Sequence, residues 1–179
     1  MYRDKTDPWN FATDTYERSR YDSLLSALAG NRYHRAFEPG CSIGVLTAGL
    51  APLCDELLAI DLSQTAISQA RKSCAAFSQV RFEVASIFDS APGPLDLLVL
   101  SELCYYFQIS DLRAWAARLL NRFVPGGTVL ACHWLGSSSD HRLTGDEAHA
   151  VLQELTEERG FTLTLSRRTE NYQLASWIL

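Results

Sequence analysis

Long apolar runs are absent from this chain. No window of its 179 residues approaches the roughly 20 consecutive apolar residues that a membrane-spanning helix needs. The first residues, Met1-Tyr2-Arg3-Asp4-Lys5, also lack the apolar core of a signal peptide. We therefore expect a cytoplasmic protein that has no membrane as a partner.

Basic residues are few. The chain has 16 Lys and Arg against 21 Asp and Glu, which gives a formal net charge of −5. Nucleic-acid binding needs clustered Lys and Arg to neutralise phosphates, whereas Arg35, Arg71-Lys72 and Arg167-Arg168 are scattered along the chain. We expect no nucleic-acid partner and interpret these residues as solvated surface charge.

The patterns of disulfide and metal proteins are also missing. Five cysteines stand at positions 41, 54, 74, 104 and 132, an odd number without a Cys-x-x-Cys pair. No His-x-x-x-His or other dense set of ligands occurs. We expect buried, reduced thiols and no metal.

What the chain does contain is an alternation of helical and strand patterns. Its length predicts a single domain spanning residues 1–179. Periodicity and turn residues predict strands at 33–38, 56–60, 80–85, 95–100, 128–134, 161–166 and 172–179. They predict helices at 14–28 and 43–53. Three further helices are predicted: one capped by Ser63, one capped by Ser110 and ended by Pro125-Gly126-Gly127, and one opened by Thr144-Gly145-Asp146-Glu147. This order indicates an α/β fold with a doubly wound sheet, and the last two strands should pair antiparallel because almost no helix separates them.

The most informative motif is Phe37-Glu38-Pro39-Gly40-Cys41-Ser42-Ile43-Gly44. It lies between a predicted strand and a predicted helix, and Asp61 ends the next strand 21 residues after Gly40. A turn containing glycine lets a ligand approach the backbone, and an acid at that position accepts hydrogen bonds from ribose hydroxyls. The pattern therefore predicts a nucleotide-cofactor site. The glycine set is incomplete, which disfavours NAD.

These features together resemble the class I S-adenosylmethionine-dependent methyltransferases, and within them the branch similar to nodulation protein S. The matching pieces are Asp7-Pro8-Trp9, Tyr16-Glu17-Arg18-Ser19-Arg20-Tyr21, Ser101-Glu102-Leu103-Cys104-Tyr105-Tyr106 and Leu143-Thr144-Gly145-Asp146-Glu147. The resemblance implies a Rossmann-like seven-stranded sheet in the order 3-2-1-4-5-7-6, with the last strand antiparallel. It also implies that residues 1–30 cover the cofactor site. Members of the branch transfer a methyl group to an amine on a chito-oligosaccharide.

The resemblance further implies that S-adenosyl-L-methionine is the cofactor and S-adenosyl-L-homocysteine the product. The residues implied for the methionine part of the cofactor are Trp9, Arg20, Glu38, Gly40, Cys41, Ser42 and Ser101, with Gly44 as a second permissive position of the turn. Asp61 would bind the ribose hydroxyls, and Leu62, Ser86 and Ile87 would contact the adenine. Alternatively, Asp61 is a helix N-cap or a turn residue at the end of its strand, and Trp9 docks the first helix on the sheet.

On the acceptor side, Glu102 and His133 are the candidates for a base that removes a proton from an amine. Tyr105, Tyr106 and Trp134 are candidates for stacking on a sugar or another ring, and His149 for lining the acceptor site. The alternatives stay open: the tyrosines are core aromatics, His133 is a structural histidine, and Asp146 and Glu147 are capping groups.

The leading functional hypothesis is methyl transfer to a small-molecule or glycan acceptor, most simply the amine of an amino sugar. The alternatives are an oxygen or sulfur acceptor, a module that binds the cofactor without turnover, and a nucleotide-sugar or NAD oxidoreductase. The oligomeric state stays open.

Overall fold

A computed structural model of the chain describes residues 14–90 and 92–179. Seven strands of the described residues form one sheet in the order β3-β2-β1-β4-β5-β7-β6, which confirms the predicted order. The strands are β1 (Tyr33–Pro39), β2 (Cys54–Asp61), β3 (Val80–Val84), β4 (Leu95–Ser101), β5 (Phe123–Trp134), β6 (Thr162–Arg168) and β7 (Tyr172–Ile178). The helices are α1 (Thr15–Leu28), α2 (Val45–Leu50), α3 (Gln64–Ser73), α4 (Ile109–Leu120) and α5 (Gly145–Glu157), with 3₁₀ turns η1 (Ala51–Leu53) and η2 (Cys104–Tyr106).

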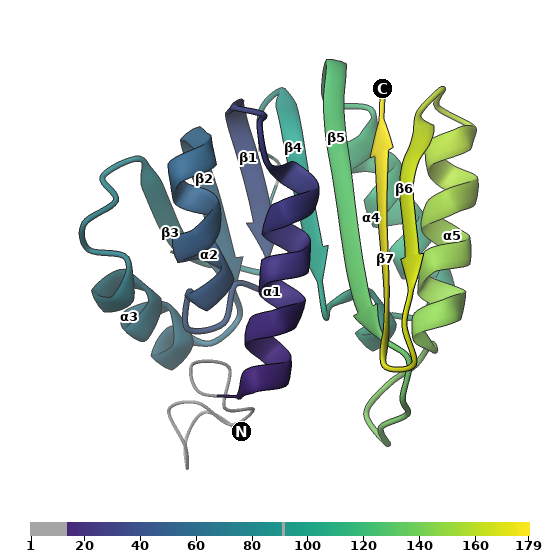
Figure 1. Cartoon of the computed structure of the whole chain (residues 1–179), viewed down its shortest axis with the longest axis horizontal. Helices are drawn as coiled ribbons and strands as arrows, with labels where there is room; N and C mark the ends of the chain where they lie inside the picture. The colour runs from purple at the N-terminus through teal and green to yellow at the C-terminus, as the bar shows by residue number, and fades with distance from the viewer. Residues whose placement is uncertain (1–13, 91) are drawn as a thin grey trace. The chain divides into compact units, whose positions relative to one another are not determined.

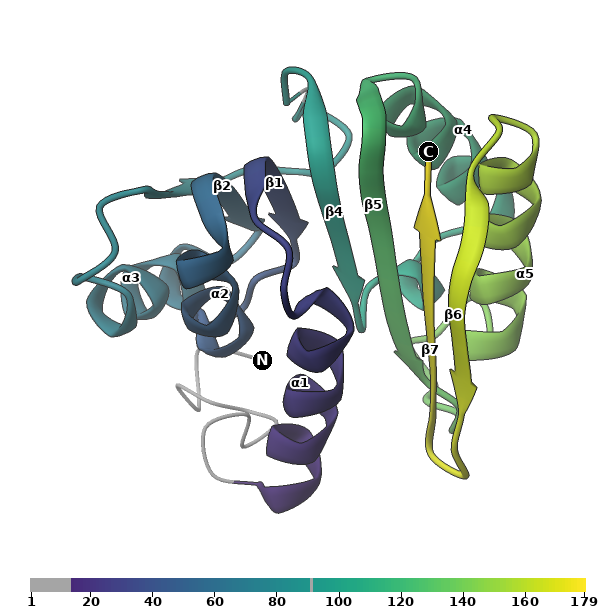
Figure 2. The same ribbon diagram turned by 45° about the horizontal axis from the view of Figure 1, so that its top comes forward.

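The chain divides into two compact units, Met1–Ser90 and Ala91–Leu179. In the first unit, β1 pairs parallel with β2, and β2 pairs parallel with β3. Figures 1 and 2 show α2 and α3 packed on one face of these strands. The carboxyl ends of the three parallel strands lie at one edge, as the pairing of Asp61 with Val84 requires. Residues that follow these strands are therefore brought together there.

Helix α1 confirms the predicted helix near the start of the chain. Asp14 is its N-cap, since its Oδ1 accepts a hydrogen bond of 2.7 Å from Tyr16 N. The apolar face buries Leu24 and Leu28 completely, and the helix packs against α2. Gly30 follows with a φ of 84°, a conformation that glycine adopts without steric cost.

In the second unit, β4 pairs parallel with β5, while β7 pairs antiparallel with both β5 and β6. The last two strands thus pair as predicted. Residues Leu97 to Leu100 of β4 are all buried, as expected of a central parallel strand. Figures 1 and 2 show α4 and α5 on the same face of these strands.

Two predicted boundaries in this unit are wrong. Helix α4 begins at Ile109 with Gln108 as its N-cap, so Ser110 lies inside the helix. Strand β5 begins at Phe123, so Pro125-Gly126-Gly127 belongs to the strand. The pairing of β4 with β5 shifts register between Leu95 and Leu97, and Gly126 has a φ of 84° there. An irregularity of the strand, rather than its beginning, explains these turn-like residues.

Candidate active site

The turn after β1 has an alternating left-handed backbone. Gly40, Ser42 and Gly44 have φ values of 77°, 51° and 83°. The prediction that the two glycines are the permissive positions is confirmed. Ser42 adopts the same conformation without being glycine, and Ser42 and Glu102 are the two non-glycine residues with positive φ in the described ranges. Such outliers persist where the surrounding structure enforces them, which is common at binding sites.

The N–H groups of this turn are used inside the protein. Gly40 N and Cys41 N both donate to the carbonyl oxygen of Ile60, at 2.8 and 2.9 Å. Ser42 N donates to Asp61 Oδ2 at 3.0 Å. Because the N–H groups of these three residues already have partners, a ligand beside them would meet carbonyl and carboxylate acceptors, which suit a cationic group.

The strain at Ser42 gives a testable expectation. Ser42→Gly and Ser42→Val both remove the hydroxyl, so the difference between them reflects the backbone conformation and the added apolar side chain. Because β-branched residues are strongly disfavoured at positive φ, we expect Ser42→Val to be less stable than Ser42→Gly by about 2 kcal/mol. Urea unfolding followed by circular dichroism measures the difference. Equal stabilities would show that the turn relaxes and that the left-handed backbone is not enforced.

Asp61 joins the turn to the start of α3. Its second oxygen, Oδ1, accepts a hydrogen bond of 2.8 Å from Ser63 N. Ser63, not Asp61, caps α3, because Ser63 Oγ accepts from Ala66 N. Burial raises the pKa of Asp61, and the backbone N–H groups of Ser63 and Ser42 oppose this shift. Each carboxylate oxygen can accept a further hydrogen bond, and the residue is partly exposed.

Glu38, at the end of β1, is a buried carboxyl with an unsatisfied oxygen. Burial raises its pKa to about 8, and the charge of Asp61 adds to this. The hydroxyl of Thr47 in α2 opposes this rise in pKa. Neither Glu38 Oε2 nor Thr47 Oγ1, however, has a hydrogen bond of ordinary geometry. The same burial, with the charges of Glu38 and Asp61, raises the pKa of the neighbouring Cys41 thiol. A buried acceptor without a partner is costly and indicates a place for a polar ligand.

Apolar and polar groups follow the next two strands. Leu62, directly after Asp61, is 76% exposed, which leaves its side chain free to cover a flat ring. Ser86 is partly exposed and its Oγ accepts from Phe88 N at 3.2 Å. Ile87 is buried, whereas the next residue, Phe88, is 44% exposed. Phe88 was not among the predicted site residues, because its exposure after β3 is visible only in the folded chain.

The structure places Arg20 on α1 as a buried side chain. Its guanidinium forms an ion pair with Glu17, one helical turn away, and lies over the ring of Tyr21 at 5.0 Å from the centroid. The predicted pairing with the methionine carboxylate stays a prediction. Trp9, the other candidate from the N-terminal segment, lies outside the described residues.

In the second unit, Glu102 follows β4 with a φ of 55°. Its main-chain N–H bonds to the carbonyl of Cys132, which pairs with Ser101 in the sheet. Its carboxylate accepts two hydrogen bonds, from Trp134 N to Oε1 at 2.8 Å and from Tyr105 OH to Oε2 at 2.6 Å. These contacts come from two different segments, so the position of the carboxylate is well defined.

The two adjacent tyrosines differ. Tyr105 is 3% exposed and Tyr106 is 37% exposed, so Tyr106 is the one that is accessible to a substrate. Burial, followed by the charges of Asp140 and Glu102, raises the pKa of Tyr106 to about 12. His141 stacks on Tyr105 at 3.8 Å and also contacts the rings of Tyr106 and Trp134. His141 was not among the predicted site residues, because it lies in a loop without a local motif.

His133 is fully buried. Its Nε2 accepts a hydrogen bond of 3.1 Å from Cys104 N, and its Nδ1 lies 3.3 Å from Nε2 of His149. His149 is also buried, and burial lowers its pKa to about 4. Both imidazoles thus have the contacts expected of structural histidines, the alternative that the sequence left open for His133.

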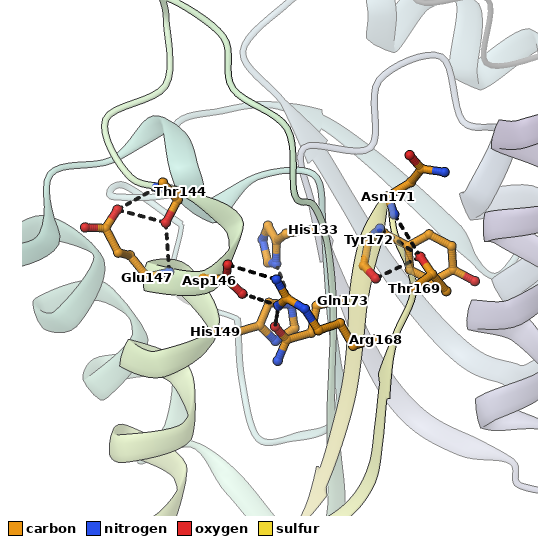
Figure 3. A network of polar contacts seen from close by, with 10 residues as sticks. All are labelled: His133, Thr144, Asp146, Glu147, His149, Arg168, Thr169, Asn171, Tyr172 and Gln173. Atoms are coloured by element: carbon orange, nitrogen blue, oxygen red, sulfur yellow. Dashed lines mark hydrogen bonds and ion pairs between the residues drawn. The ribbon is translucent and has the colours of Figure 1, made fainter.

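Figure 3 shows the polar groups around this histidine pair. Asp146 forms a bidentate contact with Arg168, with Oδ2 at 3.1 Å from Nη2. Glu147 and Thr144 form the predicted capping box of α5. Glu147 therefore has the capping role that its sequence pattern favoured, whereas the Asp146 side chain pairs with Arg168 of β6 and takes no part in the capping box.

Among the residues that the structure describes, none of the helices combines the length and the apolarity needed to cross a membrane. No group of three or more His, Cys, Asp or Glu side chains in these residues is arranged to hold a metal ion. All five cysteines are buried and free.

The strand order, with β7 antiparallel, defines a Rossmann-like fold of the methyltransferase type. Residues 2–145 match the family Nodulation protein S (NodS), and the chain belongs to this family. A nodulation protein S from Rhizobium tropici is 30% identical over 162 residues, which cover 85% of this chain and 66% of that protein. The chain spans slightly less than two thirds of the curated relatives that it matches at this identity.

Solved structures agree with this family. The N-methyltransferase NodS from Bradyrhizobium japonicum, in complex with S-adenosyl-L-homocysteine, superposes with a TM-score of 0.82 at 23% identity, covering 96% of this chain and 91% of that one. A methyltransferase candidate from Pseudomonas syringae has a TM-score of 0.78 at 32% identity, covering 93% and 100%. The predicted fold and branch are therefore confirmed.

Proposed function

We propose that the chain is an S-adenosylmethionine-dependent methyltransferase that acts on an amine, most simply that of an amino sugar or oligosaccharide. The observation that carries the proposal is the acceptor-lined turn after β1: Asp61 is fixed by Ser42 N and Ser63 N, and Glu38 keeps a buried oxygen without a partner. Diol and ammonium groups are the ligands that such acceptors fit. Membership of the nodulation protein S family supports the same cofactor.

The residues of the first unit would divide the cofactor among them. Asp61 would accept from the ribose hydroxyls, and Glu38 with the carbonyls of residues 40–42 would bind the ammonium group. Leu62 offers an exposed apolar side chain for the adenine, with Ser86 and Ile87 following β3. Trp9, Arg20 and Ser101 remain proposed for the methionine part. The bound cofactor would supply a methyl group activated as a sulfonium.

The residues of the second unit would receive the acceptor. The Glu102 carboxylate would accept a hydrogen bond from the amine and stabilise the positive charge that develops on its nitrogen. The partly exposed rings of Tyr106 and Trp134 would stack on a sugar ring. Because His133 is fully buried, we assign the polar role at the acceptor to Glu102 alone, and we assign His149 to the supporting network.

Calorimetric titration tests the cofactor. We expect wild type to bind S-adenosylmethionine and S-adenosylhomocysteine, and not NAD. Asp61→Ala removes two charge-assisted acceptors and should weaken adenosyl binding about 100-fold. Asp55→Ala, an acid on the same strand that is paired with Arg32 at the surface, is the control and should keep the affinity.

Control measurements show whether weaker adenosyl binding by Asp61→Ala comes from lost contacts or from a lost fold. Thermal unfolding of Asp61→Ala, together with Asp61→Asn, which keeps the shape of the side chain, separates lost contacts from lost fold. Absence of adenosyl binding in wild type, or a preference for NAD, overturns the proposal. Mass spectrometry of a chito-oligosaccharide with one free amine, compared with its fully N-acetylated form, distinguishes nitrogen from oxygen as the acceptor.

A further inference from the structure

The backbone at Glu102 is held in an unfavourable conformation. A φ of 55° costs a non-glycine residue about 1–2 kcal/mol. The main chain stays in register at this point, since Glu102 N bonds to the carbonyl of Cys132 at 2.9 Å. The strain must therefore be offset by other contacts of this residue, among them the two hydrogen bonds of its carboxylate.

The carboxylate is held by one main-chain donor, which every substitution except proline keeps, and by one side-chain donor, which a substitution can remove. Trp134 N, which bonds to Oε1 at 2.8 Å, is a main-chain group. The hydroxyl of Tyr105, at 2.6 Å from Oε2, is a side-chain group. Loss of this hydroxyl would remove the contact at Oε2 and leave the contact at Oε1 in place. With both oxygens fixed, its plane is defined.

The ring that carries this hydroxyl has little freedom. His141 stacks on it with centroids 3.8 Å apart and an interplanar angle of 19°. Tyr106 and His133 contact it edge to face at 4.9 and 5.5 Å. The main-chain carbonyl of Tyr105 accepts from the amides of residues 142 and 143, at 2.7 and 3.1 Å, so the loop that carries His141 is tied to the same residue.

We propose that Tyr105 is the positioning residue that orients the Glu102 carboxylate toward the acceptor amine. This assignment rests on the proposed function and replaces the predicted contact of Tyr105 with substrate. In the transfer, the nitrogen lone pair forms the new N–C bond, and the electron pair of the C–S bond leaves with sulfur. Sulfur becomes neutral and nitrogen becomes cationic, so a carboxylate fixed beside it stabilises the transition state.

The decisive variant is Tyr105→Phe, which keeps the stacked ring and removes only the hydroxyl. With a chito-oligosaccharide that has one free amine, we expect kcat to fall about tenfold, while the Kd for S-adenosylmethionine stays within twofold. Glu102→Gln should also lower kcat more than cofactor affinity. The double variant should be no slower than Glu102→Gln, because the hydroxyl acts through the carboxylate. Tyr33→Phe, a buried tyrosine of β1, is the control.

A readout that does not depend on turnover accompanies the kinetics. The amide proton of Trp134 bonds to Glu102, so its signal in a ¹⁵N-correlated spectrum reports the place of the carboxylate. We expect Tyr105→Phe and Glu102→Gln to shift this signal in the same direction, and Tyr33→Phe to leave it in place.

The results of these experiments distinguish a failure of the positioning role from a failure of the proposed function. An active wild type with an unchanged Tyr105→Phe, or with additive losses in the double variant, overturns the positioning role and leaves the proposed function intact. An unmoved Trp134 signal also overturns it. Cofactor binding without methylation of the probe overturns the amine acceptor, and this assignment falls with it.

Discussion

Gly44→Ala is expected to destabilise the folded chain by about 3 kcal/mol. The backbone contributes part of this, because a φ of 83° costs an alanine about 1–2 kcal/mol. Packing contributes the rest, since an added Cβ would lie 3.0 Å from Cβ and 3.1 Å from Cα of Ala70. Overpacking of this kind costs about 1–3 kcal/mol. Urea unfolding measures the sum.

Two companion variants separate the terms. Gly30→Ala has nearly the same φ, 84°, but no atom within 4 Å of the added Cβ, so it should cost only the backbone part. Adding Ala70→Gly to Gly44→Ala removes the nearest contact and should recover some of the stability, less the roughly 1 kcal/mol that glycine costs inside a helix. If Gly44→Ala lowers the free energy of unfolding no more than Gly30→Ala does, the close approach of the turn to α3 does not contribute to the loss of stability.

The fold was predictable where local and tertiary signals agree. Asp14, Ser63 and Thr144 cap their helices as their side chains suggest. The buried run of β4 shows in the sequence because both faces of a central parallel strand are apolar. The antiparallel closing pair follows from the missing helix between residues 168 and 172, which leaves no room for a parallel crossover.

The start of β5 was not predictable for a physical reason. Pro125-Gly126-Gly127 has the composition of a helix-ending turn, yet it lies in an irregular part of a strand, where Gly126 N bonds to the carbonyl of Leu179. An added Cβ at Gly127 would meet Phe123 and Asp96. The contacts with Leu179 and Asp96 join segments far apart in sequence, so local pattern cannot reveal them.

The candidate site also contains residues that the sequence predicts and contacts that only the folded chain shows. Glu38, Gly40, Gly44 and Asp61 stand at predictable spacings because a turn and the next strand fix them. The contact of Glu102 with Trp134 spans 32 residues and that of Tyr105 with His141 spans 36. Neither pair has a motif, and only the folded chain shows that Tyr105 binds Glu102 instead of facing outward.

The free energy of unfolding is expected to fall as pH rises from about 4.5 to 8, and Glu38→Gln should remove most of this fall. The carboxyl is buried, and its pKa rises from 4.5 to about 8 in the folded chain. Below pH 4.5, both folded and unfolded chains hold the proton. Above it, the unfolded chain releases a proton that the folded chain retains, so stability declines until the folded carboxyl also ionises. The loss is on the order of 4 kcal/mol.

Urea unfolding of wild type and Glu38→Gln at several pH values between 4.5 and 8 measures this difference. Gln keeps the size of the side chain and stays neutral, so the variant should be the more stable of the two at pH 8 and similar to wild type at pH 4.5. Glu56→Gln is the control, because Glu56 lies on the adjacent strand with an exposed carboxyl. Parallel pH profiles for wild type and Glu38→Gln would mean that Glu38 ionises freely when folded. Its buried oxygen would then be hydrated, so Glu38 would not be a buried acceptor without a partner, and only its negative charge would support the assignment to a cationic ligand.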